Sequence, residues 1–164
     1  MAWPAVETTR TIDLMIVPAA SPAPGLADLP GDWEIRDALY LGGAWTDRVI
    51  VGPNGVFTVS YDPSPGCTAV TDLGLYRGGR RLTTQVKAAL ATAFVVRRAL
   101  GDLLHEVFPY PVLAVGGDVI PGWIGRLKVT GGGELAEAVW KHPGRPLLRS
   151  QRETILSAID ARRP

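Results

Sequence analysis

The chain contains a single cysteine and no long apolar run, and these two absences exclude several classes of protein. Cys67 has no partner for an intrachain disulfide and no second thiol for a metal-binding pair. No segment approaches the roughly 18 consecutive apolar residues of a membrane span. The N-terminus lacks the basic start of a signal peptide, and its apolar run, Leu14–Val17, is too short for one. We therefore expect a cytoplasmic protein that makes no contact with a membrane.

Acidic residues are absent from 73–101, a segment with six Lys or Arg, although the whole chain carries a net charge of only +1. Residues 1–72 hold three Arg and nine Asp or Glu. The basic segment could neutralise the acidic one within the fold, and the small net charge favours this interpretation. It could instead form a phosphate-binding face. The nucleic-acid-binding residues would then be Arg77, Arg80, Arg81, Lys87 and Arg98.

The first 31 residues differ in composition from the rest of the chain. Residues 18–31 are rich in Pro, Ala and Gly and predict an extended linker, preceded by a possible short strand at Thr11–Val17. We therefore divide the chain into an N-terminal arm, 1–31, and one domain, 32–164. That length and the 46% apolar content fit a globular domain with a single core.

A β-hairpin is the strongest local prediction. Two runs rich in Val, Ile, Phe and Thr, Arg48–Val51 and Val56–Tyr61, flank Pro53-Asn54-Gly55. Such residues favour a pleated surface, Pro presets φ for a turn, and Asn-Gly tolerates positive φ. Gln85 follows the hairpin at the expected start of a long helix.

This pattern resembles the nuclease-related domain, a family of restriction-endonuclease-like nucleases. The likeness rests on an Asp before the first strand, the motif VGPNGVF at 51–57, and Gln85 downstream. It implies an α/β fold with a central mixed β-sheet flanked by α-helices. It also implies an active cleft containing Asp47, positions 60 and 62, and Gln85. Gln85 could equally close the end of its helix by hydrogen bonding.

The chain departs from the family at two of these positions. Members carry Glu-x-Lys at the end of the second strand, where this chain has Ser60 and Asp62. Side chains at i and i+2 of a strand share a face, so Glu-x-Lys can aim a carboxylate and an ammonium at one metal. An alcohol is a poor ligand for a hard cation, and Asp62 brings negative charge where the mechanism needs positive charge. We expect vestigial positions, no bound metal and no useful nuclease activity.

Two alternatives to this interpretation stay open. Asp47 and Asp62 could still hold Mg²⁺ or Mn²⁺, with a further carboxylate from Glu34. Lys87 is the nearest replacement for the missing amine, but the apolar spacing of its helix directs it to solvent. The chain could instead be a structural protein that contacts a partner, or a second copy of itself, through the N-terminal arm.

Periodicity and turn residues predict the other elements. Gly42-Gly43 marks a turn, and Cys67 is expected to be a small buried group. Strands are expected at Trp33–Leu41, Cys67–Val70, Gly74–Arg77, Val112–Val115 and, as a sheet edge, Trp123–Val129. Helices are expected at 82–107, 134–140 and 150–161. In the first helix Thr83 or Thr84 is the expected N-cap, and His105 suits the dipole of the last turn. His142 is expected to be an ordinary loop residue, and Gly131–Gly133 a strand-to-helix connection.

The sequence therefore predicts a nuclease-like α/β domain without catalysis that binds or assembles with something. A protein partner or self-association is expected, and a nucleic acid is possible. Affinity for DNA would be independent of metal and would weaken steeply with salt.

Overall fold

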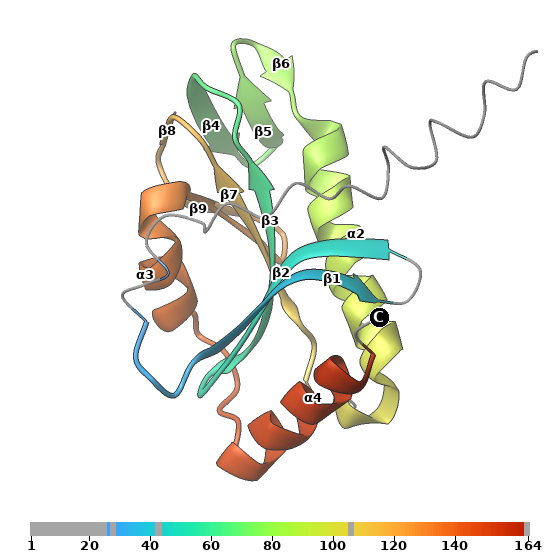
Figure 1. Ribbon diagram of the computed structural model, residues 1–164. Coiled ribbons are helices and arrows are strands. Elements are labelled where there is room, and N and C mark those ends of the chain that lie inside the picture. Colours follow the sequence, from blue (N-terminus) through green and yellow to red (C-terminus); the bar gives the residue numbers. More distant parts are fainter. Residues whose placement is uncertain (1–25, 27–28, 42–43, 105–106, 163–164) are drawn as a thin grey trace, which may run out of the picture.

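A mixed sheet of six strands forms the centre of the molecule (Figure 1). The computed structural model describes residues 26, 29–41, 44–104 and 107–162. The six strands are β1 Glu34–Leu41, β2 Ala44–Gly52, β3 Gly55–Asp62, β7 Tyr110–Val115, β9 Gly122–Ile124 and β10 Leu127–Gly131. Their order is β1-β2-β3-β7-β10-β9. β7 pairs in parallel with both β3 and β10, whereas the other neighbours are antiparallel.

A smaller sheet continues from the end of β3. Its strands are β4 Cys67–Thr71, β5 Gly74–Arg77, β6 Arg80–Arg81 and β8 Asp118–Val119, in the order β6-β5-β4-β8. The loops after β3 and β7 approach closely, and a Cβ on Gly117 would lie 2.2 Å from the carbonyl oxygen of Gly66. The predicted strands at 67–70 and 74–77 are thus confirmed as an antiparallel pair.

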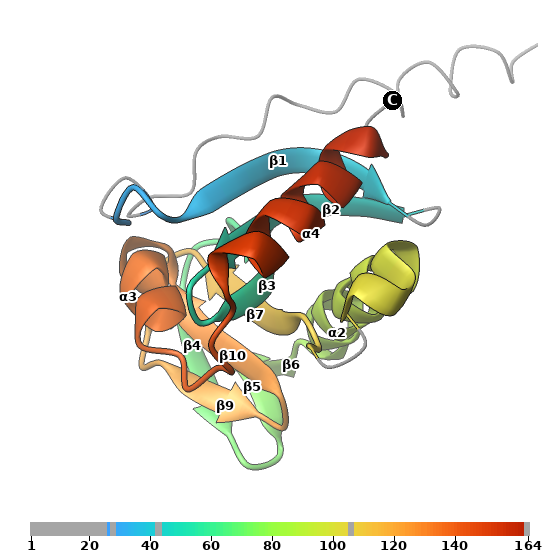
Figure 2. The ribbon, with the colours of Figure 1, turned by 90° about the horizontal axis from the view of Figure 1, so that it is seen from below.

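Helices cover both faces of the central sheet (Figure 2). They are α2 Thr83–Leu100, α3 Leu135–Trp140 and α4 Arg149–Ala161, with 3-10 turns at Gly101–Leu104 and Gly132–Glu134. α2 and α4 pack on one face, where Val49, Val51 and Val56 meet Val96 and Ile155. α3 packs on the other face. The expected α/β fold with a mixed sheet between helices is confirmed.

The central strand β7 shows why the sheet is buried on both sides. Its continuous apolar sequence is typical of a parallel strand covered on two faces. Leu113 and Val115 pack with Ala89 of α2, whereas Val112 and Ala114 pack with the α3 side of the core. The predicted buried strand at 112–115 is confirmed.

The hairpin β2–β3 turns at Pro53-Asn54, as predicted, and Asn54 has a second role. Its Nδ2 donates hydrogen bonds to the carbonyl oxygens of Val139, Trp140 and His142, at 2.9, 3.2 and 3.1 Å. These carbonyls lie at the end of α3 and just beyond it, where a helix leaves acceptors without intrahelical partners. The hairpin turn therefore holds the C-terminus of α3 against the sheet.

Three boundaries differ from the sequence prediction, and glycine explains two of them. The helix expected to run to residue 107 ends at Leu100, because Gly101 adopts φ 51° and a 3-10 turn follows. The strand expected at 123–129 is two strands, β9 and β10, joined through Gly125 at φ 57°, so β9 is the sheet edge and β10 is internal. Neither Thr83 nor Thr84 caps α2, which starts after Leu82 without a side-chain hydrogen bond.

Some expectations lie outside the described residues. They concern the strand at 11–17, most of the arm 1–31, the Gly42-Gly43 turn and His105. Within the described part of the chain, no helix is both long and apolar enough to cross a membrane.

Candidate functional site

The four positions expected in the cleft line one hollow of about 250 Å³ between β2, β3 and α2. Asp47 comes from β2, Ser60 and Asp62 come from β3, and Gln85 lies in the first turn of α2. β6 leads directly into α2, which packs across β3 and β7 and so brings its first turn over the end of β3.

Asp62 is the best-connected residue of this hollow. Its Oδ1 accepts a hydrogen bond from the backbone N–H of Ser64 at 3.0 Å, and its Oδ2 accepts one from Arg77 Nη1, also at 3.0 Å. Arg77 also donates from Nε to the hydroxyl of Thr68 at 3.1 Å, which fixes the guanidinium in place. The side chains of Asp62 and Arg77 are only 10% and 14% exposed. The pair is therefore a largely buried ion pair between the two sheets.

These contacts determine the protonation state of Asp62. Burial raises the pKa of its carboxyl, but hydrogen bonds from Ser64 and Arg77 and the charge of Arg77 outweigh burial. The pKa of Asp62 consequently lies below its usual value, and the group is ionised at neutral pH.

The other three residues are less constrained. Asp47 is exposed, and its Oδ2 accepts a hydrogen bond from the backbone N–H of Tyr61 at 3.1 Å. Ser60 and Gln85 are half-buried, and neither side chain hydrogen-bonds to another described residue. Of the two interpretations of Gln85, the placement in the cleft matches its position, because it does not cap the helix.

The arrangement does not fit a divalent cation. A hard cation needs several oxygen ligands, whereas both Asp62 oxygens already accept hydrogen bonds and a guanidinium occupies the space beside them. No three His, Cys, Asp or Glu side chains in the described part of the chain lie close enough together to hold a metal. Both carboxylate oxygens of Asp62 are therefore already engaged within the protein.

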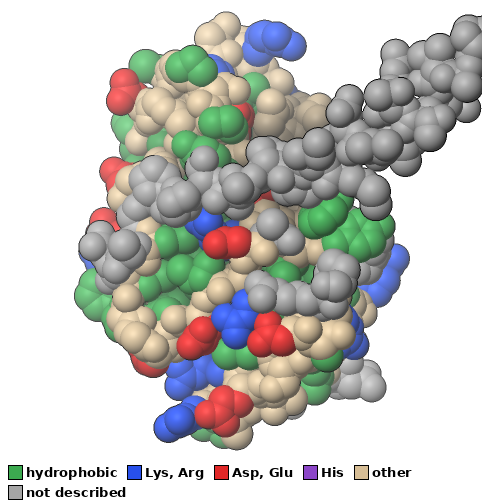
Figure 3. Space-filling model, in the orientation of Figure 1, with side chains coloured by type: hydrophobic (Ala, Val, Ile, Leu, Met, Phe, Trp, Pro, Cys, Tyr) green, Lys and Arg blue, Asp and Glu red, His purple; other side chains and the backbone are tan. Residues whose placement is uncertain are grey.

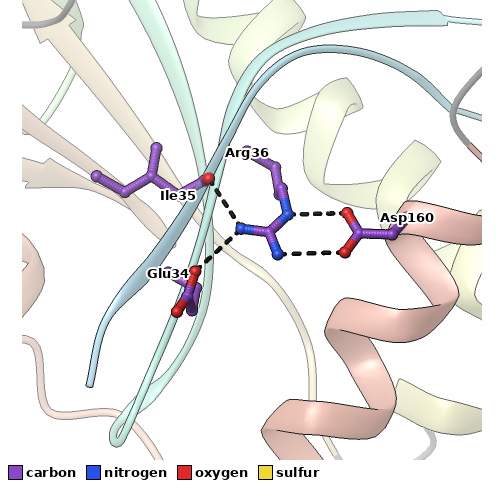
Figure 4. Close-up of polar contacts among 4 residues, drawn as sticks. All are labelled: Glu34, Ile35, Arg36 and Asp160. Atoms are coloured by element: carbon purple, nitrogen blue, oxygen red, sulfur yellow. Dashed lines mark hydrogen bonds and ion pairs between the residues drawn. The ribbon is translucent and has the colours of Figure 1, made fainter. Parts of the chain in front are cut away.

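Glu34, the further carboxylate considered from the sequence, lies elsewhere. It starts β1 and accepts a hydrogen bond from Arg36 Nη1 at 3.1 Å. Arg36 also donates two parallel hydrogen bonds to Asp160 of α4, from Nε to Oδ1 at 2.8 Å and from Nη2 to Oδ2 at 3.2 Å (Figure 4). Glu34 thus belongs to a contact that fastens α4 to the sheet edge and does not line the hollow.

The five basic residues predicted to bind nucleic acid fall into two groups. Arg77 is committed to Asp62, so its expected role as a free phosphate contact is not supported. Arg80 and Arg81 are exposed on β6, and Lys87 and Arg98 are exposed on α2. Within the described residues, none of these four has an ion-pair partner. Of these five residues, Arg77 alone pairs with an acid in the described part of the chain, which is the internal neutralisation that the small net charge favoured.

Elsewhere the charges are mixed. The face shown in Figure 3 has acidic and basic side chains interspersed over its lower half, with no large patch of one sign. Arg149 and Glu153, for example, pair along α4 at 2.9 Å. On α4 a surface cation is thus paired with an acid, whereas Arg80, Arg81, Lys87 and Arg98 have no such partner among the described residues.

Two sequence expectations outside the hollow are wrong. Cys67 is exposed, because it begins a short strand of the outer sheet. His142 is buried, because Asn54 draws its backbone to the hairpin and three aromatic rings surround its imidazole. The rings of Tyr110, Phe57 and Trp123 have centroids 4.2, 5.2 and 5.2 Å from that of His142. The sequence around residue 142 does not predict the burial of this imidazole, because the three rings come from strands distant in sequence.

Comparison with known proteins adds no relative: no family model, curated protein or solved structure matches this chain. The likeness to the nuclease-related domain therefore rests on the residues of the hairpin and of α2 alone.

Proposed function

We propose that this chain is a catalytically inactive nuclease-like domain that acts as a binding module, and that β6 and α2 hold the backbone of a nucleic acid. The observation that carries the proposal is a set of four exposed cations that have no ion-pair partner among the described residues. They are Arg80, Arg81, Lys87 and Arg98.

Helix geometry directs Lys87 and Arg98 to the same side of α2. Lys87 and Arg98 are three turns apart and point within about 20° of each other, at about 100° per residue. They are directed away from Ala89, Ala93 and Val96, which are buried against the sheet. Along the helix they are separated by about 16 Å, the rise of roughly five nucleotides in one strand of a duplex. Arg80 and Arg81 form β6, which comes immediately before the start of α2, and both are exposed.

The absence of catalysis in the proposal is supported by the contacts of Asp62. In a working site of the resembled kind, a carboxylate and an ammonium would converge on a metal-bound phosphate. Here the carboxylate is paired with Arg77, and Lys87 is exposed and does not line the hollow. Loss of one preorganised electrostatic group costs about 10²–10³ in rate.

The experiment that tests binding is a salt titration with labelled duplex and single-stranded DNA, followed by fluorescence anisotropy in EDTA. Four phosphate contacts predict a slope of about −3.6 for log K against log salt with duplex DNA. The affinity should then fall about 150-fold between about 50 and about 200 mM salt. An affinity that does not change with salt contradicts the proposal and favours a protein partner.

A double variant with a matched control assigns the effect to α2. Lys87→Gln together with Arg98→Gln should reduce the slope by about 1.8, since each cation contributes about 0.9. Arg149→Gln removes another exposed cation, one that pairs with Glu153 on α4, and it should leave the slope unchanged. Equal slopes in the wild type and the double variant contradict the assignment.

Catalysis is tested separately. Supercoiled plasmid incubated with the protein and Mg²⁺ or Mn²⁺ should remain intact. Cleavage that disappears in Asp47→Ala contradicts the inactive assignment, because it shows that the hollow still performs hydrolysis.

A further inference from the structure

A second hollow, of about 440 Å³, lies between the β9–β10 hairpin and α3. It is on the opposite face of the sheet from α2 and shares no residue with the hollow around Asp62. Its apolar lining is contributed by Pro121, Trp123, Ala138 and Pro143. This volume is within the range of sites that hold small organic molecules.

Two buried polar side chains of this lining have no hydrogen-bond partner among the described residues. Thr130 is 0% exposed and His142 is 9% exposed, and both line the hollow. Neither the Thr130 hydroxyl nor either ring nitrogen of His142 makes a hydrogen bond with the described residues. Buried polar groups are almost always hydrogen-bonded, so two such groups beside one hollow require an explanation.

The neighbours of His142 among the described residues are mainly aromatic rings. Its imidazole lies 4.2 Å from the ring of Tyr110 and 5.2 Å from those of Phe57 and Trp123, centroid to centroid. These rings supply apolar contact, but no acceptor or donor that reaches the two nitrogens. Thr130 and His142 therefore have hydrogen-bonding capacity that the described part of the chain does not use.

The charged residues around the hollow indicate which sign of charge a ligand would carry. Lys128 is half-buried, has no ion-pair partner among the described residues, and places Nζ 5.0 Å from the centroid of the Trp123 ring. Lys141, by contrast, is exposed and paired with Glu137. The buried side of the hollow thus presents one uncompensated cation, one hydroxyl and one imidazole.

Acidic residues on the exposed side of the hollow limit the negative charge that a bound ligand can carry. Glu134 and Glu137 are both exposed lining residues. Their negative charges disfavour a nucleotide or any other polyanion more than a single carboxylate, because the repulsion grows with the charge of the ligand. The apolar lining suits a flat or aliphatic body next to that carboxylate.

We propose that this hollow binds a small organic monocarboxylate, with the carboxylate held by Lys128 and Thr130 and the apolar body packed against Trp123. His142 closes the buried end and supplies a further hydrogen bond. Burial and the charge of Lys128 lower the pKa of His142, so its imidazole is neutral and retains one donor and one acceptor. The site does not depend on the proposed contact with nucleic acid.

The test is a titration of the isotope-labelled full chain, followed by amide chemical shifts, with three probes of the same shape. Benzoate should give saturable shifts centred on Trp123, Lys128, Thr130 and His142. Benzamide, which lacks the charge, should bind about tenfold more weakly, since charge-assisted hydrogen bonds are the stronger ones. Benzylamine should give no saturable shift. Shifts that do not saturate with benzoate, or tighter binding of benzylamine, overturn the proposal.

Two variants and a control complete the experiment. Lys128→Met should weaken benzoate about tenfold and leave benzamide unchanged, because only the charge interaction is removed. Thr130→Val keeps the side-chain shape and removes the hydroxyl, so it should also weaken benzoate. Lys87→Met changes an exposed cation on the other face and should have no effect. Equal benzoate affinity in Lys128→Met and the wild type overturns the proposal. Because Lys128 is only half-buried, we expect Lys128→Met to fold, and it tests the proposal even if Thr130→Val does not fold.

Discussion

Replacing Arg77 with Met tests whether Asp62 belongs to a structural ion pair. The substitution removes the guanidinium and leaves a carboxylate, 10% exposed, with the N–H of Ser64 as its remaining hydrogen-bond donor among the described residues. Breaking a buried pair from one side costs about 3–5 kcal/mol. Since the pair retains some access to water, we expect a loss of about 2–4 kcal/mol. For a chain of this size that corresponds to a fall in Tm of roughly 5–12 °C.

The assay is urea unfolding followed by circular dichroism at neutral pH, with Arg149→Met as the control. Arg149 and Glu153 are 85% and 61% exposed, so breaking their pair should cost less than about 0.5 kcal/mol. The double variant Asp62→Asn/Arg77→Met should recover part of the loss, because the amide needs no counter-charge. Equal costs for Arg77→Met and the control would refute the structural role of the pair.

Acid provides an independent measurement on the same pair. The pKa of Asp62 is lower in the fold than in the unfolded chain, so its contribution to stability is fully present above about pH 4. That contribution is lost as the pH falls through the folded pKa. In Arg77→Met, burial acts with less opposition and the folded pKa rises. The difference in unfolding free energy between wild type and variant should therefore shrink on acidification; a difference that stays constant down to about pH 3 contradicts the reasoning.

Two further outcomes are expected. Gly52→Ala should cost about 2–4 kcal/mol in urea unfolding, because its Cβ would lie 2.1 Å from a ring carbon of the buried Trp33. In the control Gly133→Ala the added Cβ meets nothing within 4 Å, so stability should change by less than about 0.5 kcal/mol. Similar costs at both sites would contradict the packing argument. Burial and the charge of Lys128 lower the pKa of His142, so the unfolded chain takes up a proton first and the free energy of unfolding should decrease as the pH falls below about 6.5. His142→Phe should flatten this decrease in fluorescence-detected unfolding, and an unchanged pH profile would show that His142 does not cause it.

The sequence by itself determined the elements that depend on near neighbours. The hairpin around Asn54, the buried strand β7, and helices α3 and α4 lie within a few residues of their predicted positions. Alternation, helical periodicity and turn residues act over a few positions, so they can be read without knowledge of the fold. The shared hollow of Asp47, Ser60, Asp62 and Gln85 was expected from the resemblance to the nuclease-related domain and not from periodicity. The end of α2 was missed because a helical pattern continues past Gly101, where the backbone turns left-handed.

Only the tertiary structure decided which charged and polar groups are used. Asp62 could have been a metal ligand or a solvated acid until the smaller sheet placed Arg77 beside it. Asn54 was a turn residue until the fold brought α3, about 85 positions later, to its amide. His142 was a loop residue until three strands enclosed it. Burial and ion pairing depend on contacts between segments distant in the chain, and these contacts determine whether a carboxylate, an amide or an imidazole binds a ligand or stabilises the fold.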